Sequence, residues 1–450
     1  MKVLLIYMPV HKSHDSVGMR IIPPSVLYYL GGILERDGFD VDIIDPHDVR
    51  RFMPIENCRS EFVISVTERI RNADIVCLSS NTHNWPTTKD MVAIVKEVDP
   101  SKKVILGGLH PTYFHEHIIR STEADFIMRG EGEKALPELL RCLDENEDVS
   151  NIVGLTWRIG EQVYLADKIA RVDKSEFITA PLPLYDLLPD NAYNIMPIHT
   201  SRGCRFACKF CSIPRKRDWV GLDYTWVVDR IEKIVGHYAS KFNDKCIYIT
   251  DDCFTADPQR ATKLLNKMID MNSEMSIILE ARATDLFDEN LLNTLKHKNI
   301  VRIAIGIECG YDEGLKKIKK GLTTDQILRT MDKLREFKLH DKLFLSFIIG
   351  FPWEGLDECS ETIEFAVSLI KQYELDAVNL NWLTLLPSEL WDERNIYGIR
   401  LEPSVFDDNY YFVSQKYFFE TRPLLDSSSV LYLNKLISDY EDRGVYLHKA

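Results

Sequence analysis

The residues with the clearest chemistry are three cysteines, Cys204, Cys208 and Cys211, which follow one another with the spacing C-x3-C-x2-C. Three thiolates on one short loop can hold a cubane iron–sulfur cluster, although such clusters usually have four cysteine ligands. No fourth cysteine belongs to this motif, so one iron would keep an open coordination position. An open position on a bound metal is typical of a catalytic site rather than a structural one.

Zinc binding and disulfide bonding are the alternatives for these cysteines. A zinc site needs a fourth ligand and commonly uses two C-x2-C pairs, but the chain has no second pair. The other cysteines are scattered and lie mostly in apolar stretches, where a free cysteine behaves as a small buried hydrophobe. We expect no secretory signal, because the apolar stretch at residues 3–7 is short. A reducing, cytoplasmic location is therefore expected, and the pattern favours the cluster.

Length and charge limit the class of protein. The 450 residues are enough for about two to four domains with substantial cores. The formal net charge of −14 argues against nucleic acid as the principal partner, because nucleic-acid-binding surfaces are usually basic. No apolar run reaches the roughly 18 residues that span a bilayer, so we expect no membrane span.

Residues 1–145 are expected to form a Rossmann-like, doubly wound parallel sheet. Apolar runs that alternate with amphipathic stretches predict strands at residues 3–7, 41–45, 75–79, 104–106 and 126–128. Continuous apolar strands that alternate with helices indicate a parallel sheet covered on both faces. Ligands of such sheets bind outside the carboxyl ends of the strands.

Two glycines, Gly107 and Gly108, follow the fourth predicted strand. They would either let a ligand approach the backbone or serve a tight strand-to-helix turn, and we take them as candidate cofactor-binding residues. Glu131 and Glu133 lie at a helix start, where acidic side chains favour the dipole, so we expect a structural role for them. No G-x-G-x-x-G follows the first strand, so a nicotinamide site is not expected. Other residues expected at this edge are Pro9, His11 and residues 80–83.

Residues 146–194 are expected to form a linker with a hairpin at 152–166 that turns at Gly160. From residue 195 a second series of strand–helix units begins. Its strands are expected at residues 196–199, 246–250, 277–281, 301–307, 343–349 and 377–382. Six such units over residues 195–400 predict a partial, TIM-like (β/α)6 barrel, with active residues at the strand carboxyl ends. One of its helices should begin with a capping box formed by Thr323 and Gln326.

Polar residues follow several strands of this second series, and we expect them to bind a ligand. They are Asp251 and Asp252 after the second strand, Glu280 and Arg282 after the third, Glu308 after the fourth, and Gly350 and Pro352 after the fifth. Turn residues are common at strand ends, which explains the glycine and the proline. It does not explain why charged side chains should converge on one rim.

The second half of the chain resembles the radical S-adenosylmethionine (SAM) superfamily. The resemblance rests on the C-x3-C-x2-C motif and on Phe210, the aromatic residue before the last cysteine. It implies a [4Fe–4S] cluster on the three cysteines and SAM chelated by the open iron. The reduced cluster of that family cleaves SAM to methionine and a 5′-deoxyadenosyl radical, and the cofactor carries this chemistry.

The resemblance also implies roles for the rim residues. Asp251 and Asp252 lie where the family contacts the methionine amine, and Arg282 is the candidate for the carboxylate. Glu308 matches the ribose-contacting position, although Cys309 stands where relatives often have serine. Residues 348–352, which include Gly350 and Pro352, match the adenine-contacting segment. General acid and base residues are not assigned.

The first half resembles the cobalamin-binding domain that precedes the barrel in one class of radical SAM enzymes. The runs that are similar are residues 23–32, 107–111, 129–133 and 183–189. The corrinoid-ligating motif D-x-H-x-x-G is absent after the first strand. Asp45 and His47 echo it after the second strand, without the glycine, and we treat them as unrelated. Cobalamin is therefore implied by the resemblance alone.

Together these features predict a radical SAM enzyme that abstracts hydrogen from a small-molecule metabolite and methylates its carbon with cobalamin. The alternative is radical dehydration, rearrangement or oxidation without methyl transfer. A non-catalytic iron–sulfur regulator and a nucleic-acid-modifying enzyme are further alternatives. The class implies an external electron donor such as flavodoxin or ferredoxin. Residues 401–450 resemble no known domain, and we expect this C-terminal extension to cap the barrel.

Overall fold

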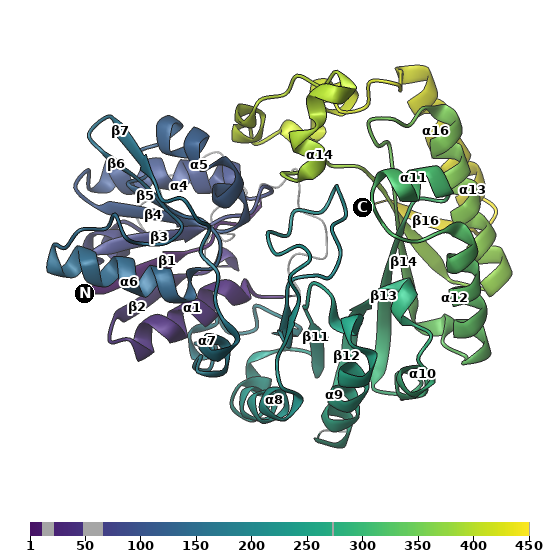
Figure 1. Ribbon diagram of the computed structural model, residues 1–450, viewed down its shortest axis with the longest axis horizontal. Coiled ribbons are helices and arrows are strands. Elements are labelled where there is room, and N and C mark those ends of the chain that lie inside the picture. The colour runs from purple at the N-terminus through teal and green to yellow at the C-terminus, as the bar shows by residue number, and fades with distance from the viewer. Residues whose placement is uncertain (11–21, 48–65, 272–273, 450) are drawn as a thin grey trace. The chain divides into compact units, whose positions relative to one another are not determined.

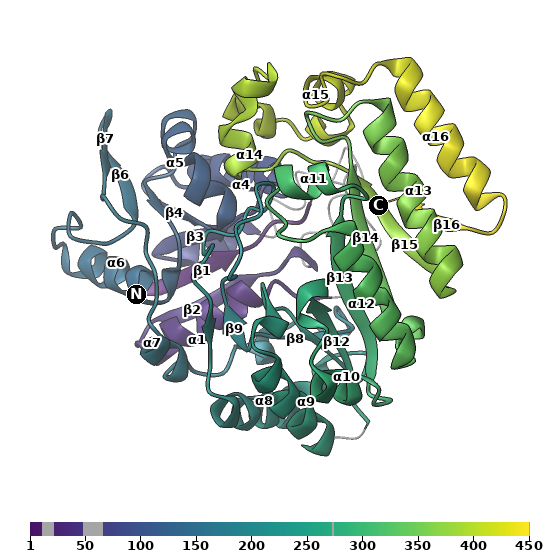
Figure 2. The ribbon, with the colours of Figure 1, turned by 45° about the vertical axis from the view of Figure 1, so that its right-hand side comes forward.

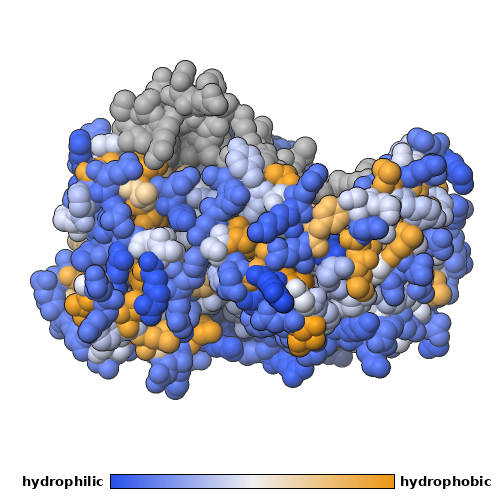
Figure 3. All heavy atoms as spheres, turned by 90° about the horizontal axis from the view of Figure 1, so that it is seen from above, coloured by the Kyte–Doolittle hydropathy of each residue, from blue (hydrophilic) through white to orange (hydrophobic). Residues whose placement is uncertain are grey.

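The computed structural model describes residues 1–10, 22–47, 66–271 and 274–449. The chain forms two compact units. The first comprises residues 1–194, 233–243 and 402–412, and the second comprises residues 195–232, 244–401 and 413–450. No helix within the described ranges is long and apolar enough to cross a membrane. On the face shown in Figure 3, hydrophobic residues form small patches scattered among hydrophilic ones.

The first unit is built on a seven-stranded sheet with the strand order β2-β1-β3-β4-β5-β6-β7. Strands β1 to β5 are parallel, which confirms the predicted Rossmann-like sheet, and β6 and β7 are antiparallel. The strands are β1 (Lys2–Ile6), β2 (Asp40–Ile44), β3 (Ile75–Ser79), β4 (Lys103–Gly107), β5 (Phe126–Met128), β6 (Leu155–Ile159) and β7 (Gln162–Leu165). The chain reverses its direction of winding between β1 and β3, and ligands of doubly wound sheets bind at such a switch point.

Helices cover both faces of this sheet (Figure 1). Helices α1 (Ser25–Arg36) and α6 (Gly132–Glu145) contact each other on one face, and α4 (Trp85–Val98) and α5 (Leu109–Ser121) lie on the other. Because the strands are covered on both sides, the four consecutive residues of β1 from Val3 to Ile6 are all apolar and almost fully buried.

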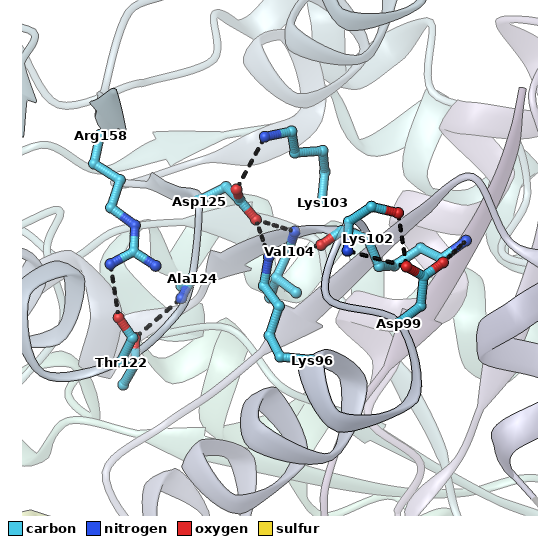
Figure 4. A network of polar contacts seen from close by, with 10 residues as sticks. Lys96, Asp99, Lys102, Lys103, Val104, Thr122, Ala124, Asp125 and Arg158 are labelled. Atoms are coloured by element: carbon cyan, nitrogen blue, oxygen red, sulfur yellow. Dashed lines mark hydrogen bonds and ion pairs between the residues drawn. The ribbon is translucent and has the colours of Figure 1, made fainter. Parts of the chain in front are cut away.

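A charged network fixes the edge of this sheet opposite to the strand carboxyl ends (Figure 4). The carboxylate of Asp125, just before β5, accepts hydrogen bonds from the Lys96 ammonium and from the Val104 amide, both over 2.9 Å. Lys96 lies in the last turn of α4 and also donates to the Lys102 carbonyl over 2.8 Å. The network therefore joins a helix end to two neighbouring strands.

The predicted hairpin at residues 152–166 is present, but it extends the first sheet instead of lying in a linker. Strand β6 pairs antiparallel with β5, with Trp157 opposite Phe126. Leu155 and Thr156 are fully buried by this pairing. The first unit therefore continues past residue 145, to residue 194.

The second unit is built on a parallel sheet with the strand order β16-β15-β14-β13-β12-β11-β8. Its strands are β8 (Met196–Ile198), β11 (Cys246–Ile249), β12 (Ser276–Ala281), β13 (Ile300–Glu308), β14 (Leu343–Ile349), β15 (Ala377–Trp382) and β16 (Tyr446–Lys449). The first six match the predicted strands to within a residue or so, and the partial-barrel architecture is confirmed. The seventh, β16, was not predicted. Two short strands, β9 (Ser201–Arg202) and β10 (Val220–Gly221), form a separate antiparallel pair.

Helices lie on the outer side of this curved sheet (Figure 1). They are α8 (Tyr224–Tyr238), α9 (Pro258–Met271), α10 (Glu289–Leu295), α12 (Thr324–Glu336) and α13 (Leu356–Tyr373), and the short helix α11 (Asp312–Lys317) follows the carboxyl end of β13. The predicted capping box of α12 is confirmed, since the Thr323 hydroxyl accepts from the Gln326 amide and the Gln326 side chain accepts from the Thr323 amide.

The C-terminal extension is divided between the two units. Residues 402–412 group with the first unit, where Phe406 packs against the buried ring of Tyr411 at 5.0 Å. The remaining residues belong to the second unit, where α16 (Ser427–Glu441) contacts α13 and leads into β16 beside β15 (Figure 2). The extension therefore adds a helix and a strand to the barrel, which differs from the cap that we expected.

Gly108→Ala should destabilise the first unit more than Gly107→Ala. Gly108 has a φ of +97°, and a Cβ atom there would lie 2.4 Å from the Ser80 carbonyl oxygen, so the substitution combines backbone strain with overlap. A Cβ at Gly107 would meet only the Met128 carbonyl oxygen, at 3.8 Å. Urea unfolding should give a loss of about 2 kcal/mol or more for Gly108→Ala. Equal losses for the two variants would contradict this account.

Candidate functional site

The cysteine loop runs between β9 and β10, whose pairing closes its base. Within the loop the amide of Cys204 donates to the Arg215 carbonyl over 3.0 Å, and the Asp218 amide donates to the Cys204 carbonyl over 3.2 Å. A side chain has no room at Gly203, because a Cβ atom there would lie 2.2 Å from the Asp218 carbonyl oxygen. The protein's own backbone contacts therefore shape the loop.

The three predicted cluster ligands, Cys204, Cys208 and Cys211, are all half-buried on this loop. Among the residues that the structure describes, no group of three or more His, Cys, Asp or Glu side chains is spaced to hold a single metal ion. Each cysteine of a four-iron cluster binds a different iron, so its ligands need not converge on one point. The assignment of the three cysteines to a cluster fits this loop and stays a prediction.

Cys253 contacts the cysteine loop, and the sequence did not suggest a role for it. The hydrogen bond between its thiol and Cys204 lowers the pKa of Cys204 to about 6, and the Phe206 amide and the Arg282 charge act in the same direction. Burial instead raises the pKa of Cys211 to about 11. Because thiolates are the form that binds metals, Cys204 is the better prepared of these two ligands.

Asp251 is buried just after β11, and its carboxylate is hydrogen-bonded by other groups of the protein. Its carboxylate accepts hydrogen bonds of 2.6 Å from the Thr200 amide, the Thr200 hydroxyl and the Ser201 hydroxyl. Burial nevertheless raises the pKa of this carboxyl. The geometry makes Asp251 a support for the start of the cysteine loop.

The neighbouring Asp252 is exposed and has spare hydrogen-bonding capacity. One of its carboxylate oxygens accepts from the Gly203 amide over 2.9 Å. Of the two predicted amine-binding aspartates, Asp252 is therefore the one whose side chain remains available to a ligand.

Arg282 presents a buried guanidinium beside the cysteine loop. The residue is 9% exposed, and its Nε and Nη2 atoms have no hydrogen-bond partner in the described part of the chain. The guanidinium lies 3.5 Å from the centroid of the Phe206 ring, within the loop. Unsatisfied buried donors are costly, and a carboxylate ligand would satisfy both atoms. This arrangement fits the predicted contact with the carboxylate of SAM.

Glu308 ends β13 in an uncommon backbone conformation. Its φ is +75°, and the register with β14 shifts between Gly306 and Glu308. The carboxylate is buried and accepts a hydrogen bond of 2.8 Å from the Lys320 ammonium. Non-glycine residues in this conformation concentrate at functional sites, which fits the predicted ribose-binding role.

The predicted adenine segment, residues 348–352, is held by a buried acid that sequence reasoning missed. The carboxylate of Glu354 accepts hydrogen bonds from the Gly350 amide over 2.7 Å and from the Phe351 amide over 3.0 Å. The buried Arg422 lies against the same turn, since a Cβ at Gly350 would be 2.7 Å from its Nε. Pro352 follows in the turn and is buried. Arg422 comes from the C-terminal extension, so no local sequence signal pointed to it.

In the first unit, the backbone of Ser80 fills the space beside Gly108 in the predicted glycine loop. The amide of Ser80 donates to the Gly107 carbonyl over 2.9 Å, and the His110 amide donates to the Ser80 carbonyl over 3.3 Å. The His110 ring is fully buried and stacks on Trp85 at 4.9 Å, and burial lowers its pKa to about 3. The backbone at Gly107 is left open to a ligand.

Other predicted residues at this edge have protein partners or are not described. Glu131 accepts a hydrogen bond from the Val172 amide over 2.8 Å, which supports its expected structural role. The buried Asp45 accepts hydrogen bonds of 2.5 Å from the hydroxyls of Tyr28 and Tyr193, so this echo of the corrinoid motif belongs to the core. His11 lies outside the described residues.

The inner face of the second sheet carries accessible polar side chains. Along β11 to β15 every second residue is buried against the helices, and the residues between them are half-buried or exposed. The polar residues on this inner face are Tyr248, Glu280, Arg302, Ser346, Asn379 and Asn381. The Tyr248 hydroxyl donates to the Glu280 carboxylate. Arg302 stacks on the Phe344 ring at 3.7 Å and has no hydrogen bond or ion pair with any described residue.

Two family models match the chain, in the order that the fold suggests. The model described as "B12 binding domain" matches residues 16–140, and the model described as "Radical SAM superfamily" matches residues 198–366. The chain contains a B12-binding domain followed by a radical SAM domain. The radical SAM domain implies a [4Fe–4S] cluster and SAM, and the B12-binding domain supports cobalamin as a further cofactor.

Curated relatives of this chain include proteins named as methyltransferases and cyclases. It is 28% identical over 401 residues to an uncharacterized methyltransferase of Pyrococcus horikoshii, which covers 87% of this chain and 83% of the relative. It is 25% identical over 472 residues to the anaerobic magnesium-protoporphyrin IX monomethyl ester cyclase of Rubrivivax gelatinosus, which covers 100% of this chain and 78% of that protein.

Solved structures with the same fold include two cobalamin-dependent or cobalamin-bound radical SAM enzymes. OxsB with aqua-cobalamin bound matches with a TM-score of 0.67 at 19% identity over 81% of this chain, and this chain spans only 52% of OxsB. The methyltransferase TsrM from Kitasatospora setae, with cobalamin and a [4Fe–4S] cluster bound, matches with a TM-score of 0.68 at 16% identity, over 90% of this chain and 76% of TsrM. At these identities the likeness concerns the fold.

In the protein without a cluster, iodoacetamide should modify Cys204 faster than Cys211 at pH 7.5. The neighbouring Cys253 thiol lowers the pKa of Cys204, whereas burial raises that of Cys211, so Cys204 carries the larger fraction of thiolate. Cys253→Ala should slow the modification of Cys204 severalfold, whereas Cys246→Ala, which removes another buried thiol of the same strand region, should not. Peptide mass spectrometry over time measures both rates. If Cys253→Ala leaves the rate of Cys204 modification unchanged, the contact between Cys253 and Cys204 is contradicted.

The stability of the second unit should fall between pH 5 and pH 8 because of Glu354. Burial raises the pKa of this carboxyl from 4.5 to about 7, so its contribution to folding is complete below about pH 4.5 and is lost as the pH rises through about 7. The whole change is worth about 3 kcal/mol. Glu354→Gln should flatten the profile in denaturant unfolding, and Glu361→Gln, on the exposed side of α13, should not. If the free energy of unfolding depends on pH in the same way in the wild type and in Glu354→Gln, the proposed contribution of Glu354 is ruled out.

Proposed function

We propose that this radical SAM enzyme is a cobalamin-dependent methyltransferase that acts on an unactivated carbon of a small metabolite. The observation that carries the proposal is the pairing of three half-buried cysteines on one loop with the buried, unsatisfied guanidinium of Arg282. These groups could hold a cluster and the carboxylate of its ligand side by side. The B12-binding domain supports the methyl-transfer version.

In this proposal, different residues of the second unit bind different parts of SAM. Arg282 binds the carboxylate, Asp252 accepts from the amine, and Glu308 accepts from the ribose hydroxyls. The backbone around Gly350 and Pro352 receives the adenine. When bound, the reduced cluster supplies an electron that cleaves SAM and produces a 5′-deoxyadenosyl radical, for which we propose an external one-electron donor such as flavodoxin or ferredoxin.

Cobalamin is proposed to bind at the strand carboxyl ends of the first unit. The switch point between β1 and β3 lies at this edge, and the open space beside Gly107 allows a ligand to approach the backbone. Gly108 does not belong to this set, because the Ser80 backbone fills the space beside it.

The substrate is proposed to be small and polar. The inner face of the sheet has the Tyr248–Glu280 pair and the unpaired cation of Arg302, all accessible. A large apolar substrate would leave these groups desolvated and unsatisfied, which is costly. A substrate with hydroxyl, amine or anionic groups would satisfy them.

A radical reaction without methyl transfer is the second candidate. It is favoured by the relatives named as cyclases and by a further relative, 23% identical over 324 residues, named 4′-phospho-dehydrooxetanocin synthase of Priestia megaterium. These names show that similar chains serve more than one reaction type.

Product analysis distinguishes the two candidates. The holoenzyme, prepared without oxygen and supplied with SAM, cobalamin, reductant and a metabolite extract as the source of substrate, should produce both 5′-deoxyadenosine and S-adenosylhomocysteine. Production of 5′-deoxyadenosine alone would favour the second candidate. Cys204→Ala, Cys208→Ala and Cys211→Ala should each abolish the cluster absorbance and both products while leaving the circular dichroism spectrum unchanged. Full iron content and activity in any of these variants would refute the cluster assignment.

A further inference from the structure

Lys320 is a buried cation that no part of the proposed SAM site uses directly. It lies in the turn between α11 and α12 and is 7% exposed. Its ammonium donates to Oε1 of Glu308 over 2.8 Å. The pair is buried on both sides, since the side chains of Lys320 and Glu308 are 8% and 11% exposed. An ion pair this buried is held by its surroundings, unlike the surface pairs of this chain.

The lysine keeps the Glu308 side chain folded back over its own strand. A Cβ atom at Gly306 would lie 2.2 Å from Glu308 Oε1 and 3.1 Å from the Lys320 ammonium, so the pair occupies the space above the glycine. Glu308 reaches this position through its φ of +75° and the irregular register with β14. Such a conformation persists only where neighbouring contacts determine it. Here the Cys309 amide donates to the Ile307 carbonyl over 3.1 Å across Glu308, and the ammonium of Lys320 holds the carboxylate at the end of the side chain.

The turn that carries Lys320 also contacts the other parts of the SAM site. Two residues before Lys320, the Ile318 carbonyl accepts a hydrogen bond of 3.0 Å from the Lys209 amide of the cysteine loop. One residue after it, Gly321 leaves room for Arg282, whose Nη2 would lie 3.5 Å from a Cβ at that position. The turn therefore lies against the cysteine loop, the carboxylate-binding arginine and the ribose-binding glutamate.

We propose that Lys320 is a positioning residue that presents Glu308 to the ribose of SAM. The ammonium binds Oε1, and Oε2 accepts no hydrogen bond from the described residues, so this oxygen is left for a ribose hydroxyl. Because the same turn contacts the cysteine loop, the lysine also fixes the distance between the ribose-binding oxygen and the cluster-binding loop. This inference rests on the proposed SAM-binding role of Glu308.

The test compares the binding of two ligands to variants of the anaerobically reconstituted holoenzyme. The ligands are SAM and its analogue that lacks both ribose hydroxyls, and calorimetry measures each Kd. In the wild type, SAM should bind at least tenfold more tightly than the analogue. Lys320→Met should reduce this ratio to about threefold or less, mainly through weaker SAM binding, with the iron content unchanged. Glu308→Gln should reduce it in the same way.

Lys319→Met is the matched control. It removes the same charge from the neighbouring position of the turn, where the side chain is 45% exposed and pairs with Glu389, and it should leave the ratio at the wild-type value. If Lys320→Met does not fold, Lys320→Gln carries the test with the same criterion, because its side chain is shorter and uncharged and so lacks the ammonium that binds Oε1, yet it places a polar group in the same buried site.

The possible outcomes separate this inference from the proposed function. If Lys320→Met weakens the binding of both ligands equally, or of neither, the lysine has a structural role only and the inference is overturned. If the wild type with a full cluster binds SAM with no preference over the analogue, the ribose role of Glu308 fails. If it does not bind SAM at all, the proposed function itself fails.

Discussion

The end of strand β11 holds the cysteine loop through three consecutive residues, and the candidate site depends on this attachment. Asp251 accepts hydrogen bonds from Thr200 and Ser201, Asp252 accepts one from Gly203, and Cys253 contacts Cys204. Successive residues after β11 therefore contact successive residues of the segment that enters the cysteine loop. A loop of this length would otherwise have considerable conformational freedom. The buried carboxylate of Asp251 is the strongest of these contacts because three donors satisfy it.

The fold and the core of the site were predictable because both follow from local patterns. Apolar runs of five to seven residues mark the buried strands at residues 75–79 and 343–349 to the residue. The C-x3-C-x2-C spacing marked the cysteine loop, and the carboxyl-end rule placed Arg282 and Glu308 near it. In each case the relevant information lies within one strand and the turn that follows it.

The features that the sequence did not reveal depend on contacts between distant segments. The hairpin at residues 155–165 has a clear local pattern, but nothing in that pattern says that it pairs with β5. Lys320 lies in a run of lysines, and its burial against Glu308 distinguishes it from the exposed Lys319 only in three dimensions. The two adjacent aspartates are alike in sequence, yet one faces inward and is satisfied while the other is exposed. Such differences arise from packing rather than from residue type.

The position of Arg422 has a consequence for how this protein can be divided. The segment that matches the radical SAM family ends at residue 366, whereas Arg422 lies against Gly350, donates to the carbonyls of Phe418 and Leu383, and stacks on Trp382. A fragment cut at the family boundary would contain the cysteine loop but would expose the turn at Gly350 to water. During synthesis, the turn at Gly350 leaves the ribosome well before Arg422, whose guanidinium covers it. In this chain the turn at Gly350 is therefore completed by a residue that lies 56 positions beyond the end of the matched segment.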